Sequence, residues 1–298
     1  MSDQGSSQPQ TKTLVFACTK EYRRFSEFCD ACRKYRYIGV CHGVPGAGKT
    51  RSAREYASWD RIEPLLPEQL FTLAGRSHSN GEFPHKPFAS LMAPSFTEIA
   101  PCRSAFYTAP VASSPGRIER EVMALSASLS YLVEAAEQAS RGNDDFLLSY
   151  RIPERTELVI VDEADRLKMA GLEQLRDLYD RGRFGLVLIG MPGLEKRLAR
   201  YPQLYSRVGF VHQFRVLSEE EMRYLLEQRW SHLSMNMQRD NFTDQEAIST
   251  ILRITGGNFR VIHRLLMQVE RILQINELQM VTKEVVEAAR ENLVIGQA

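Results

Sequence analysis

Short apolar runs alternate with amphipathic stretches from residue 37 to residue 217. The runs predicted to be strands are 37–42, 105–108, the run that begins at Leu158, 185–190 and 210–216. Helix-periodic stretches cover 19–36, 51–59, about 117–139 and 172–179, and a basic helix is expected to end near Tyr201. Strands that alternate with helices in this way predict a three-layer α/β domain built around a parallel sheet.

The pattern changes at Ser218. The segments 218–221 and 243–246 both have the spacing of a helix capping box, and each opens a helix-periodic stretch. Two further helices are predicted over about 258–275 and 282–293. We therefore expect an α/β domain over residues 13–217, followed by a small all-helical domain over residues 218–298.

Two segments lack either pattern. Residues 1–12 are small and polar, which indicates a disordered leader and argues against a signal peptide. Residues 60–103 contain many prolines and little periodicity, so we expect an irregular insertion there. Exposure and irregularity make this insertion and the tail after Arg290 candidates for contacts with a partner protein.

Composition limits the class of protein. A chain of 298 residues with 43% hydrophobic residues can bury a full core, and no apolar run approaches a membrane-spanning length. The formal net charge of +1 excludes a uniformly basic coat for nucleic acid. Five irregularly spaced cysteines predict reduced thiols and a cytoplasmic location. Cys29 and Cys32 have no second pair of ligands, so buried thiols are expected there in preference to zinc.

A glycine-rich segment follows the first predicted strand and precedes a helix. It fits G-x-x-x-x-G-K-[ST] and consists of Gly43, Val44, Pro45, Gly46, Ala47, Gly48, Lys49 and Thr50, with Arg51 as the next residue of the binding segment. Glycines let successive backbone N–H groups turn toward anionic phosphates. Lys49 is expected to reach the β- and γ-phosphates of ATP, and the Thr50 hydroxyl to bind Mg²⁺. A chance glycine-rich turn is the alternative, which the flanking strand and helix disfavour.

The run that begins at Leu158 ends in two acidic residues. Its continuous apolar character is typical of a central parallel strand covered on both sides by helices. Ligands bind at the carboxyl ends of such strands, so Asp162 is predicted to hold Mg²⁺ and Glu163 to orient or deprotonate the attacking water. Acidic residues after a strand can also form an ordinary turn, and the glycine-rich segment upstream favours the catalytic reading.

With these motifs and a C-terminal helical region in this order, the chain resembles AAA+ ATPases over nearly its whole length. Within that class it is similar to the transposition ATPases of the TnsC, TniB, MuB and IstB group. The similarity rests on the segment from Leu158 to Leu167, the Leu-Ile-Gly-Met-Pro-Gly turn, and the segments 204–207 and 256–260. Secretion ATPases of the ExeA type carry similar blocks.

The resemblance implies roles for two arginines. Arg207 matches the arginine finger, which acts in trans on the ATP bound by a neighbouring subunit, and Arg260 matches the sensor-2 arginine of the lid. Either could instead be a solvated charge at a helix end. Most AAA+ proteins carry a polar sensor-1 residue after the fourth strand, whereas this chain has Gly190 and Met191. We therefore expect ATP hydrolysis that is slow and dependent on assembly.

The resemblance also implies contacts with DNA. Transposition ATPases track the DNA backbone with residues that follow the second strand, and the matching segment here is 113–117 together with Arg120. Arg117 and Arg120 are the candidate DNA contacts, which predicts binding that is sensitive to salt and tolerant of sequence. Both could equally be ordinary surface charges in the first turns of a helix.

The expected function is that of an ATP-dependent regulator of DNA transposition. It would oligomerise on duplex DNA as a ring or helical filament, mark the target and recruit or activate a transposase, with hydrolysis driving disassembly. An ExeA-like secretion ATPase is one alternative, which the absence of a membrane segment disfavours. A nucleotide-switched scaffold or helicase-loader-like adaptor is another. The missing polar residue after the fourth strand favours that adaptor, and Asp162, Glu163 and Arg207 argue against it.

Overall fold

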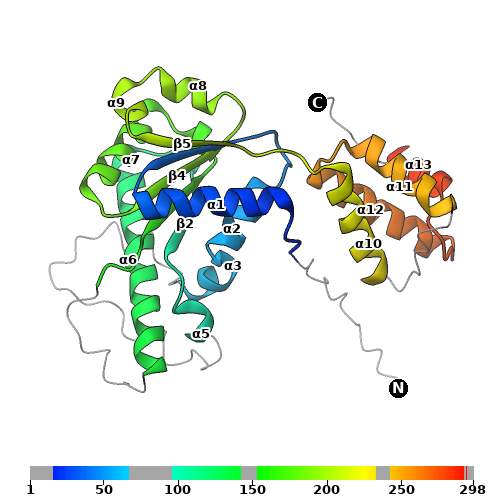
Figure 1. The fold of residues 1–298 in the computed structure, drawn as a ribbon, viewed down its shortest axis with the longest axis horizontal. Coiled ribbons are helices and arrows are strands. Elements are labelled where there is room, and N and C mark those ends of the chain that lie inside the picture. The colour runs from blue at the N-terminus through cyan, green and yellow to red at the C-terminus, as the bar shows by residue number, and fades with distance from the viewer. Residues whose placement is uncertain (1–15, 67–95, 142–152, 233–241, 292, 294–298) are drawn as a thin grey trace, which may run out of the picture.

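The computed structural model describes residues 16–66, 96–141, 153–232, 242–291 and 293. Figure 1 shows an α/β part built around a sheet and a group of helices beside it, joined by the chain that leaves strand β5. Each part has its own cluster of buried apolar side chains. The expected α/β fold with a helical C-terminal region is confirmed.

Five parallel strands form the sheet in the order β2-β3-β4-β1-β5. They are β1 (Ile38–His42), β2 (Ser104–Thr108), β3 (Leu158–Asp162), β4 (Gly185–Gly190) and β5 (Val208–Gln213). Every residue of β3 and β4 is buried, as the apolar runs predict for central strands, whereas β5 lies at the edge and is partly exposed. The carboxyl ends of β1, β3 and β4 therefore meet at one edge of the sheet.

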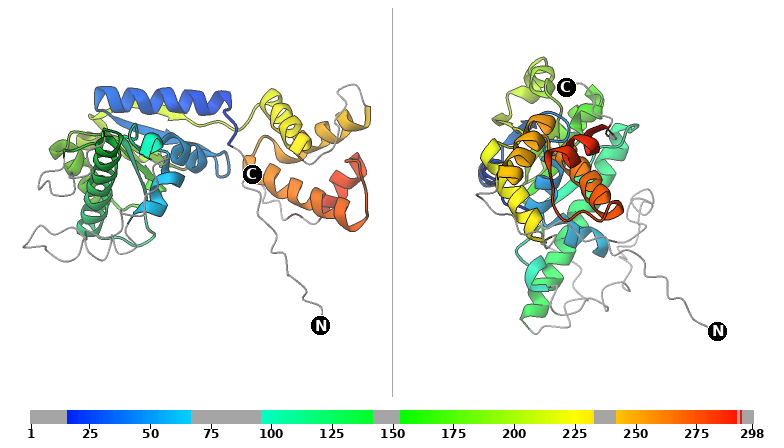
Figure 2. Two further views of the ribbon diagram at one scale, coloured as in Figure 1. Left: turned by 90° about the horizontal axis from the view of Figure 1, so that it is seen from below. Right: turned by 90° about the vertical axis from the view of Figure 1, so that its right-hand side faces the viewer.

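Helices cover both faces of the sheet. They are α1 (Lys20–Tyr35), α2 (Lys49–Tyr56), α3 (Trp59–Ile62), η1 (Glu63–Leu65), α5 (Phe96–Ile99), α6 (Pro115–Ser140), η5 (Ala164–Arg166), α7 (Met169–Arg181), α8 (Leu194–Ala199) and α9 (Pro202–Tyr205). In β2, the Phe106 ring lies 6.3 Å from the ring of Trp59, while the hydroxyl of Tyr107 donates to Glu121 of α6. Consecutive strand residues point to opposite faces of a sheet. Helices α2 and α3 therefore cover one face of the sheet, and α6 covers the other (Figure 2).

The helical part consists of α10 (Glu219–His232), α11 (Phe242–Thr255), α12 (Phe259–Ile275) and α13 (Lys283–Glu291). We call this group the lid. Its apolar residues, among them Leu265, Ile251 and Val286, are fully or nearly fully buried against one another. The lid therefore has a core of its own, separate from that of the sheet.

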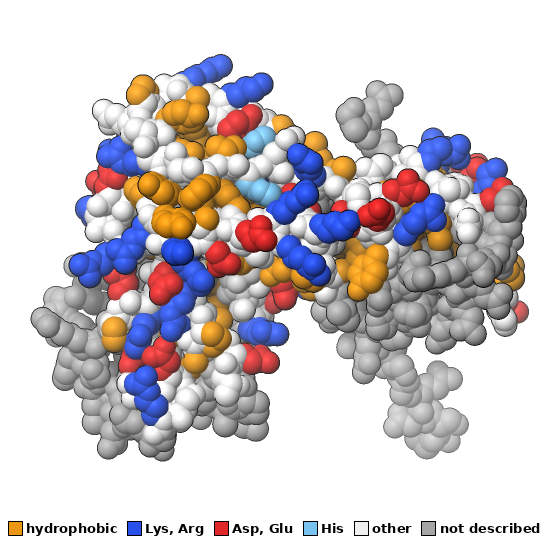
Figure 3. Space-filling model, viewed as in Figure 1, with side chains coloured by type: hydrophobic (Ala, Val, Ile, Leu, Met, Phe, Trp, Pro, Cys, Tyr) orange, Lys and Arg blue, Asp and Glu red, His pale blue; other side chains and the backbone are white. Residues whose placement is uncertain are grey.

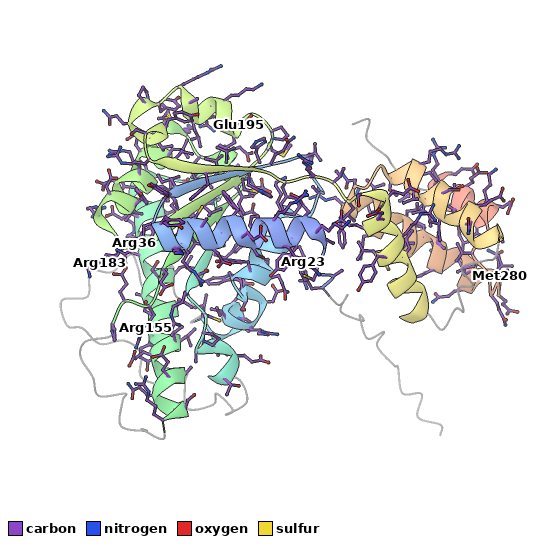
Figure 4. The ribbon with its side chains drawn as sticks, in the orientation of Figure 1. Arg23, Arg36, Arg155, Arg183, Glu195 and Met280 are labelled. Atoms are coloured by element: carbon purple, nitrogen blue, oxygen red, sulfur yellow. The ribbon has the colours of Figure 1, made fainter. Side chains whose placement is uncertain are left out.

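Glu221 joins the lid to the α/β part. Its side chain accepts from the backbone N–H of Ser218 at 2.9 Å, and Ser218 Oγ accepts from Glu221 N–H at 3.3 Å, which is the predicted capping box. The other carboxylate oxygen accepts from the backbone N–H of Lys20, the first residue of α1, at 2.7 Å. Arg23 and Arg36 mark the two ends of α1 in Figure 4, and the Arg23 end faces the lid. One carboxylate thus caps two helices.

Some sequence predictions were wrong in their boundaries. Strand β5 ends at Gln213, although the pattern predicts a strand to residue 216, because Phe214 and Leu217 stay buried after the backbone leaves the sheet. The expected insertion over 60–103 forms short helices at its described ends, and its residues 67–95 lie outside the described residues. The leader over 1–12 and the last residues of the tail also lie outside them.

Two cysteines of α1 are buried, as expected. Cys29 and Cys32 are buried on the face of α1 that meets the sheet, and their thiols are free. Among the described residues no group of three or more His, Cys, Asp or Glu side chains could hold a metal ion by itself.

Candidate functional site

The glycine-rich segment forms a loop between β1 and α2. Gly46 and Gly48 have φ of +81° and +111°, which a residue with a Cβ adopts only under strain. The ammonium of Lys49 donates to the carbonyl oxygens of Gly43 at 2.6 Å and Val44 at 3.0 Å. Burial lowers the pKa of Lys49. The loop thus presents a lysine and the amino end of a helix at the edge of the sheet, which is an anion-binding arrangement.

Two oxygen ligands face each other beside the loop. The Thr50 hydroxyl donates to Asp162 Oδ2 at 2.7 Å, although the two residues are 112 positions apart. Asp162 is only 3% exposed at the carboxyl end of β3. A hydroxyl and a carboxylate are hard oxygen donors of the kind that Mg²⁺ takes alongside phosphate oxygens and water. These residues therefore fit Mg²⁺ bound together with a nucleotide.

Glu163 has an unusual backbone. Its φ of 55° and ψ of 35° lie in the left-handed region, and conformations of this kind in non-glycine residues often occur at functional sites. Its N–H donates to Asp162 Oδ1 at 2.9 Å. Its carboxylate lies 3.5 Å from the guanidinium of Arg166, which also donates to the carbonyl oxygen of Ala109 beyond β2 at 3.2 Å. Arg166, which the sequence analysis did not select, connects Glu163 to the segment that follows β2.

The amino end of α12 closes the site from the lid side. A cavity of about 500 Å³ is lined by the glycine-rich loop, Arg51, Asp162, Glu163, the end of β4 and residues of α12. The backbone N–H of Arg260 donates to the carbonyl oxygen of Gly46 at 3.2 Å. His263 and Arg264 line the same cavity. These two residues were missed, although three- and four-residue spacing from Arg260 places them on the same side of a helix.

The end of β4 contributes no polar side chain to this cavity. A Cβ on Gly190 would lie 2.6 Å from Asp165 Oδ1 and 2.8 Å from Leu194, so a side chain there would displace the ends of these two side chains. The same Asp165 oxygen accepts from the backbone N–H of Met191 at 3.1 Å. Met191 itself lines the cavity. Asp165 therefore occupies the space into which a side chain at position 190 would extend.

Arg207 lies away from this cavity. Its backbone carbonyl accepts from the N–H of Ile38 at 3.1 Å, so it sits beside the start of β1, whereas the glycine-rich loop follows the end of that strand. Its guanidinium donates to Asp180 Oδ1 at 2.5 Å and to the carbonyl oxygen of Gln203. Asp180 is also bonded to Arg176 at 2.8 Å.

The two arginines selected as DNA contacts differ in their surroundings. Both lie in the first turns of α6, and Arg117 donates to Glu121 at 2.6 Å, so its charge is balanced within the chain. Arg120 is exposed. Figure 3 shows basic and acidic side chains interspersed over the viewed face, as the net charge of +1 leads one to expect. On the viewed face, basic side chains therefore form local groups and no continuous surface.

A second cavity, of about 580 Å³, lies between the amino ends of α1 and α10. Its charges largely pair with one another: Lys20 with Glu220, Arg24 with Glu21 and Arg223 with Glu219. It has no glycine-rich loop. The smaller cavity beside Lys49 is therefore the better candidate for a nucleotide.

Comparison with known proteins supports this choice. The model of the AAA domain family matches residues 32–198, which include the glycine-rich loop and β3. The chain belongs to the AAA domain family. A potential ATP-binding protein of Staphylococcus aureus is 43% identical to this AAA domain protein over 286 residues, which are 96% of this chain and 99% of that protein.

Two solved structures show the same fold. The RuvB Holliday junction branch migration motor of Thermotoga maritima has a TM-score of 0.54 and 16% identity, covering 93% of this chain and 69% of that one. The ORC2 protein of Aeropyrum pernix, solved in ADPNP–ADP complexes, has a TM-score of 0.54 and 14% identity, covering 96% of this chain and 71% of that one. At these identities the similarity concerns the fold.

This AAA domain protein is thus a nucleotide-binding protein with the P-loop ATPase fold. In the part of the chain that the structure describes, none of the helices is both long enough and apolar enough to cross a membrane.

Proposed function

We propose that this chain is an ATP-dependent regulator of DNA transposition. In this proposal it assembles on duplex DNA in the cytoplasm, marks the DNA as a target and recruits or activates a transposase. Hydrolysis of ATP to ADP and phosphate then releases the assembly. The observation that carries the assembly step of this proposal is the separation of Arg207 from its own nucleotide cavity, and the role in transposition rests on the resemblance to the transposition ATPases.

Different residues around the cavity bind the phosphates, hold the metal ion and activate the attacking water in this proposal. Lys49 and the N–H groups of the glycine-rich loop bind the phosphates, and Thr50 and Asp162 hold Mg²⁺. When held there, Mg²⁺ would neutralise negative charge on the phosphates. Glu163 orients the attacking water and accepts its proton, while Arg260 reaches the terminal phosphate from the lid. The strained backbone of Glu163 supports a functional role for this residue.

Arg207 acts on the nucleotide of a neighbouring copy. It lies beside Ile38 at the start of β1, and a strand of five residues extends about 16 Å. The side chain therefore cannot reach the loop at the other end of the same strand. A guanidinium supplied by a neighbour stabilises the charge that develops during phosphoryl transfer, so each site becomes complete only in an assembly. Nucleotide held between two copies also stabilises their contact.

DNA is proposed to bind near the amino end of α6. Residues 113–117 follow β2, and Arg120 is an exposed arginine on the first turns of the helix. Arg117 is already paired with Glu121, so Arg120 is the better donor to a DNA phosphate. Contacts of this type carry affinity without sequence information, which suits a protein that marks many targets.

Electron microscopy of the purified protein with duplex DNA and a non-hydrolysable ATP analogue tests the proposal. We expect rings or filaments on DNA only when both components are present. Arg207→Ala should abolish DNA-stimulated hydrolysis, while Arg200→Ala, at an exposed arginine before β5, should leave hydrolysis unchanged. Oligomers that ignore DNA would refute the role in transposition and leave the AAA ATPase fold intact.

One observation favours a second function. With Asp165 filling the space beside Gly190, no polar side chain from β4 helps hold the attacking water. A nucleotide-switched scaffold that recruits a protein partner with negligible hydrolysis would have no need of such a residue. Glu163→Gln separates the two functions: it should trap a hydrolysing switch in long-lived assemblies and leave a non-hydrolysing scaffold unaffected.

A further inference from the structure

Two glycines set the position of helix α12. Gly256 and Gly257 have φ of +53° and +79°, so the chain turns sharply before the helix. The carbonyl oxygen of Gly257 accepts from the N–H of Leu217, in the segment between the sheet and the lid, at 3.0 Å. A Cβ at Gly257 would lie only 2.3 Å from the Leu217 carbonyl oxygen. The turn is therefore packed tightly against the segment that connects the two parts of the chain.

Asn258 follows this turn and uses both ends of its amide. The side-chain oxygen accepts from the backbone N–H groups of Arg260 at 3.1 Å and Val261 at 3.3 Å, which caps the helix. The side-chain nitrogen donates to the carbonyl oxygen of Pro45 in the glycine-rich loop at 2.8 Å. One side chain thus fixes the start of α12 and ties it to the phosphate-binding loop, 213 residues earlier in the chain.

Gly46 completes this contact. A Cβ there would lie 2.4 Å from Asn258 Oδ1 and 2.9 Å from the Cβ of Arg260, so only glycine lets the lid come this close. The Gly46 carbonyl oxygen accepts from the N–H of Arg260 at 3.2 Å. The loop and the first turn of α12 therefore meet through two hydrogen bonds and a close backbone approach.

We propose that Asn258 is the positioning residue that holds Arg260 over the terminal phosphate and so makes the site distinguish ATP from ADP. This inference rests on the role of Arg260 in the proposed function. In this proposal Asn258 acts through the helix that it caps and tethers. Because coupling between sites is reciprocal, a tether that favours ATP over ADP also makes ATP hold the lid against the loop.

Binding measurements on the full chain without DNA test the inference. Asn258→Ser keeps a good helix cap and removes the amide donor to Pro45. We expect it to weaken binding of a non-hydrolysable ATP analogue about fivefold, the effect of one ordinary hydrogen bond, and to change ADP binding less than about twofold. Asn276→Ser is the matched control, because Asn276 lies at the other end of α12 and its side chain, among the described residues, donates only to the Ile272 carbonyl oxygen of that helix, at 2.9 Å.

A double-mutant cycle separates positioning from general damage to the loop. If Asn258 acts through Arg260, the variant carrying both Asn258→Ser and Arg260→Ala should bind the ATP analogue as Arg260→Ala alone does. Additive losses, or equal losses for the ATP analogue and ADP, would overturn the inference. An Arg260→Ala variant that binds both nucleotides normally would instead remove the role of Arg260 from the proposed function.

Discussion

The adjacent glycines before α12 predict different outcomes for the same substitution. Gly256 and Gly257 both have positive φ, so alanine places a Cβ in an unfavourable backbone conformation at either position. At Gly256 the new Cβ meets no heavy atom within 4 Å. At Gly257 it collides with the carbonyl oxygen of Leu217, which belongs to the backbone and cannot move like a flexible side chain. Comparing the two substitutions therefore measures how much the contact between the turn and Leu217 contributes to the free energy of unfolding.

The expected losses follow from these contacts. A left-handed conformation costs a residue with a Cβ about 1–2 kcal/mol, and alanine recovers about 0.4–1 kcal/mol by restricting the unfolded chain. Gly256→Ala should thus lower the free energy of unfolding by about 1 kcal/mol or less. Gly257→Ala also disturbs the hydrogen bond from Leu217 N–H, worth about 1 kcal/mol, and forces a local shift that costs about 1 kcal/mol or more. Its total loss should be about 3 kcal/mol.

Urea denaturation followed by circular dichroism measures both losses, and binding of an ATP analogue provides an independent second assay. Gly257 precedes Asn258, so moving the turn away from Leu217 should also draw Asn258 away from Pro45 and weaken nucleotide binding. Gly256→Ala should bind nucleotide as the unmodified chain does. Equal destabilisation by the two substitutions would show that the contact with Leu217 does not hold the lid, and would refute the reasoning.

Three further outcomes are expected. Glu221→Ala should lower the melting temperature more than Glu220→Ala, because Glu221 caps two helices whereas Glu220 makes an exposed ion pair. Burial raises the pKa of Glu21, but its contact with His212 at 3.0 Å contributes to a net pKa below the ordinary 4.5. The stability that Glu21 adds is therefore complete above pH 4.5 and is lost as the pH falls through its pKa in the folded protein. Glu21→Gln should flatten the acid side of a plot of stability against pH. Cys18 is exposed and the other four thiols are buried, so a thiol reagent should label Cys18 alone in the native protein, as mass spectrometry would reveal.

The sequence predicts most of the sheet and the residues around the nucleotide cavity. Lys49, Thr50, Asp162 and Glu163 follow apolar runs, and parallel strands bring such positions to one edge of the sheet. The limit of β5 was predicted less well, because burial in a core gives Phe214 the same apolar character whether it lies in a strand or just after one. The pattern of apolar residues along a sequence indicates which side chains are buried, but it does not indicate where the hydrogen bonds between strands end.

Contacts between distant segments could not be predicted in this way. Asn258 has an evident local role as a helix cap, which accounts fully for its presence in a sequence. Its bond to Pro45 depends on how the lid is placed on the sheet, which no periodicity reports. Glycine is required at position 46 for two reasons, its positive φ and the close approach of α12. The sequence indicates only the first of them, through the glycine-rich motif.

Arg207 is the residue through which one chain acts on another in the proposed assembly. Within the single chain its guanidinium is paired with Asp180, which a purely structural role would explain. Asp180 also binds Arg176, so it keeps a partner when Arg207 moves away. Partly exposed ion pairs contribute about 1 kcal/mol or less, a small cost beside the stabilisation that a neighbour's nucleotide can return. In the proposed assembly, the pairing with Asp180 therefore does not prevent Arg207 from acting on a neighbour's nucleotide, and it holds Arg207 in a defined position before the copies meet.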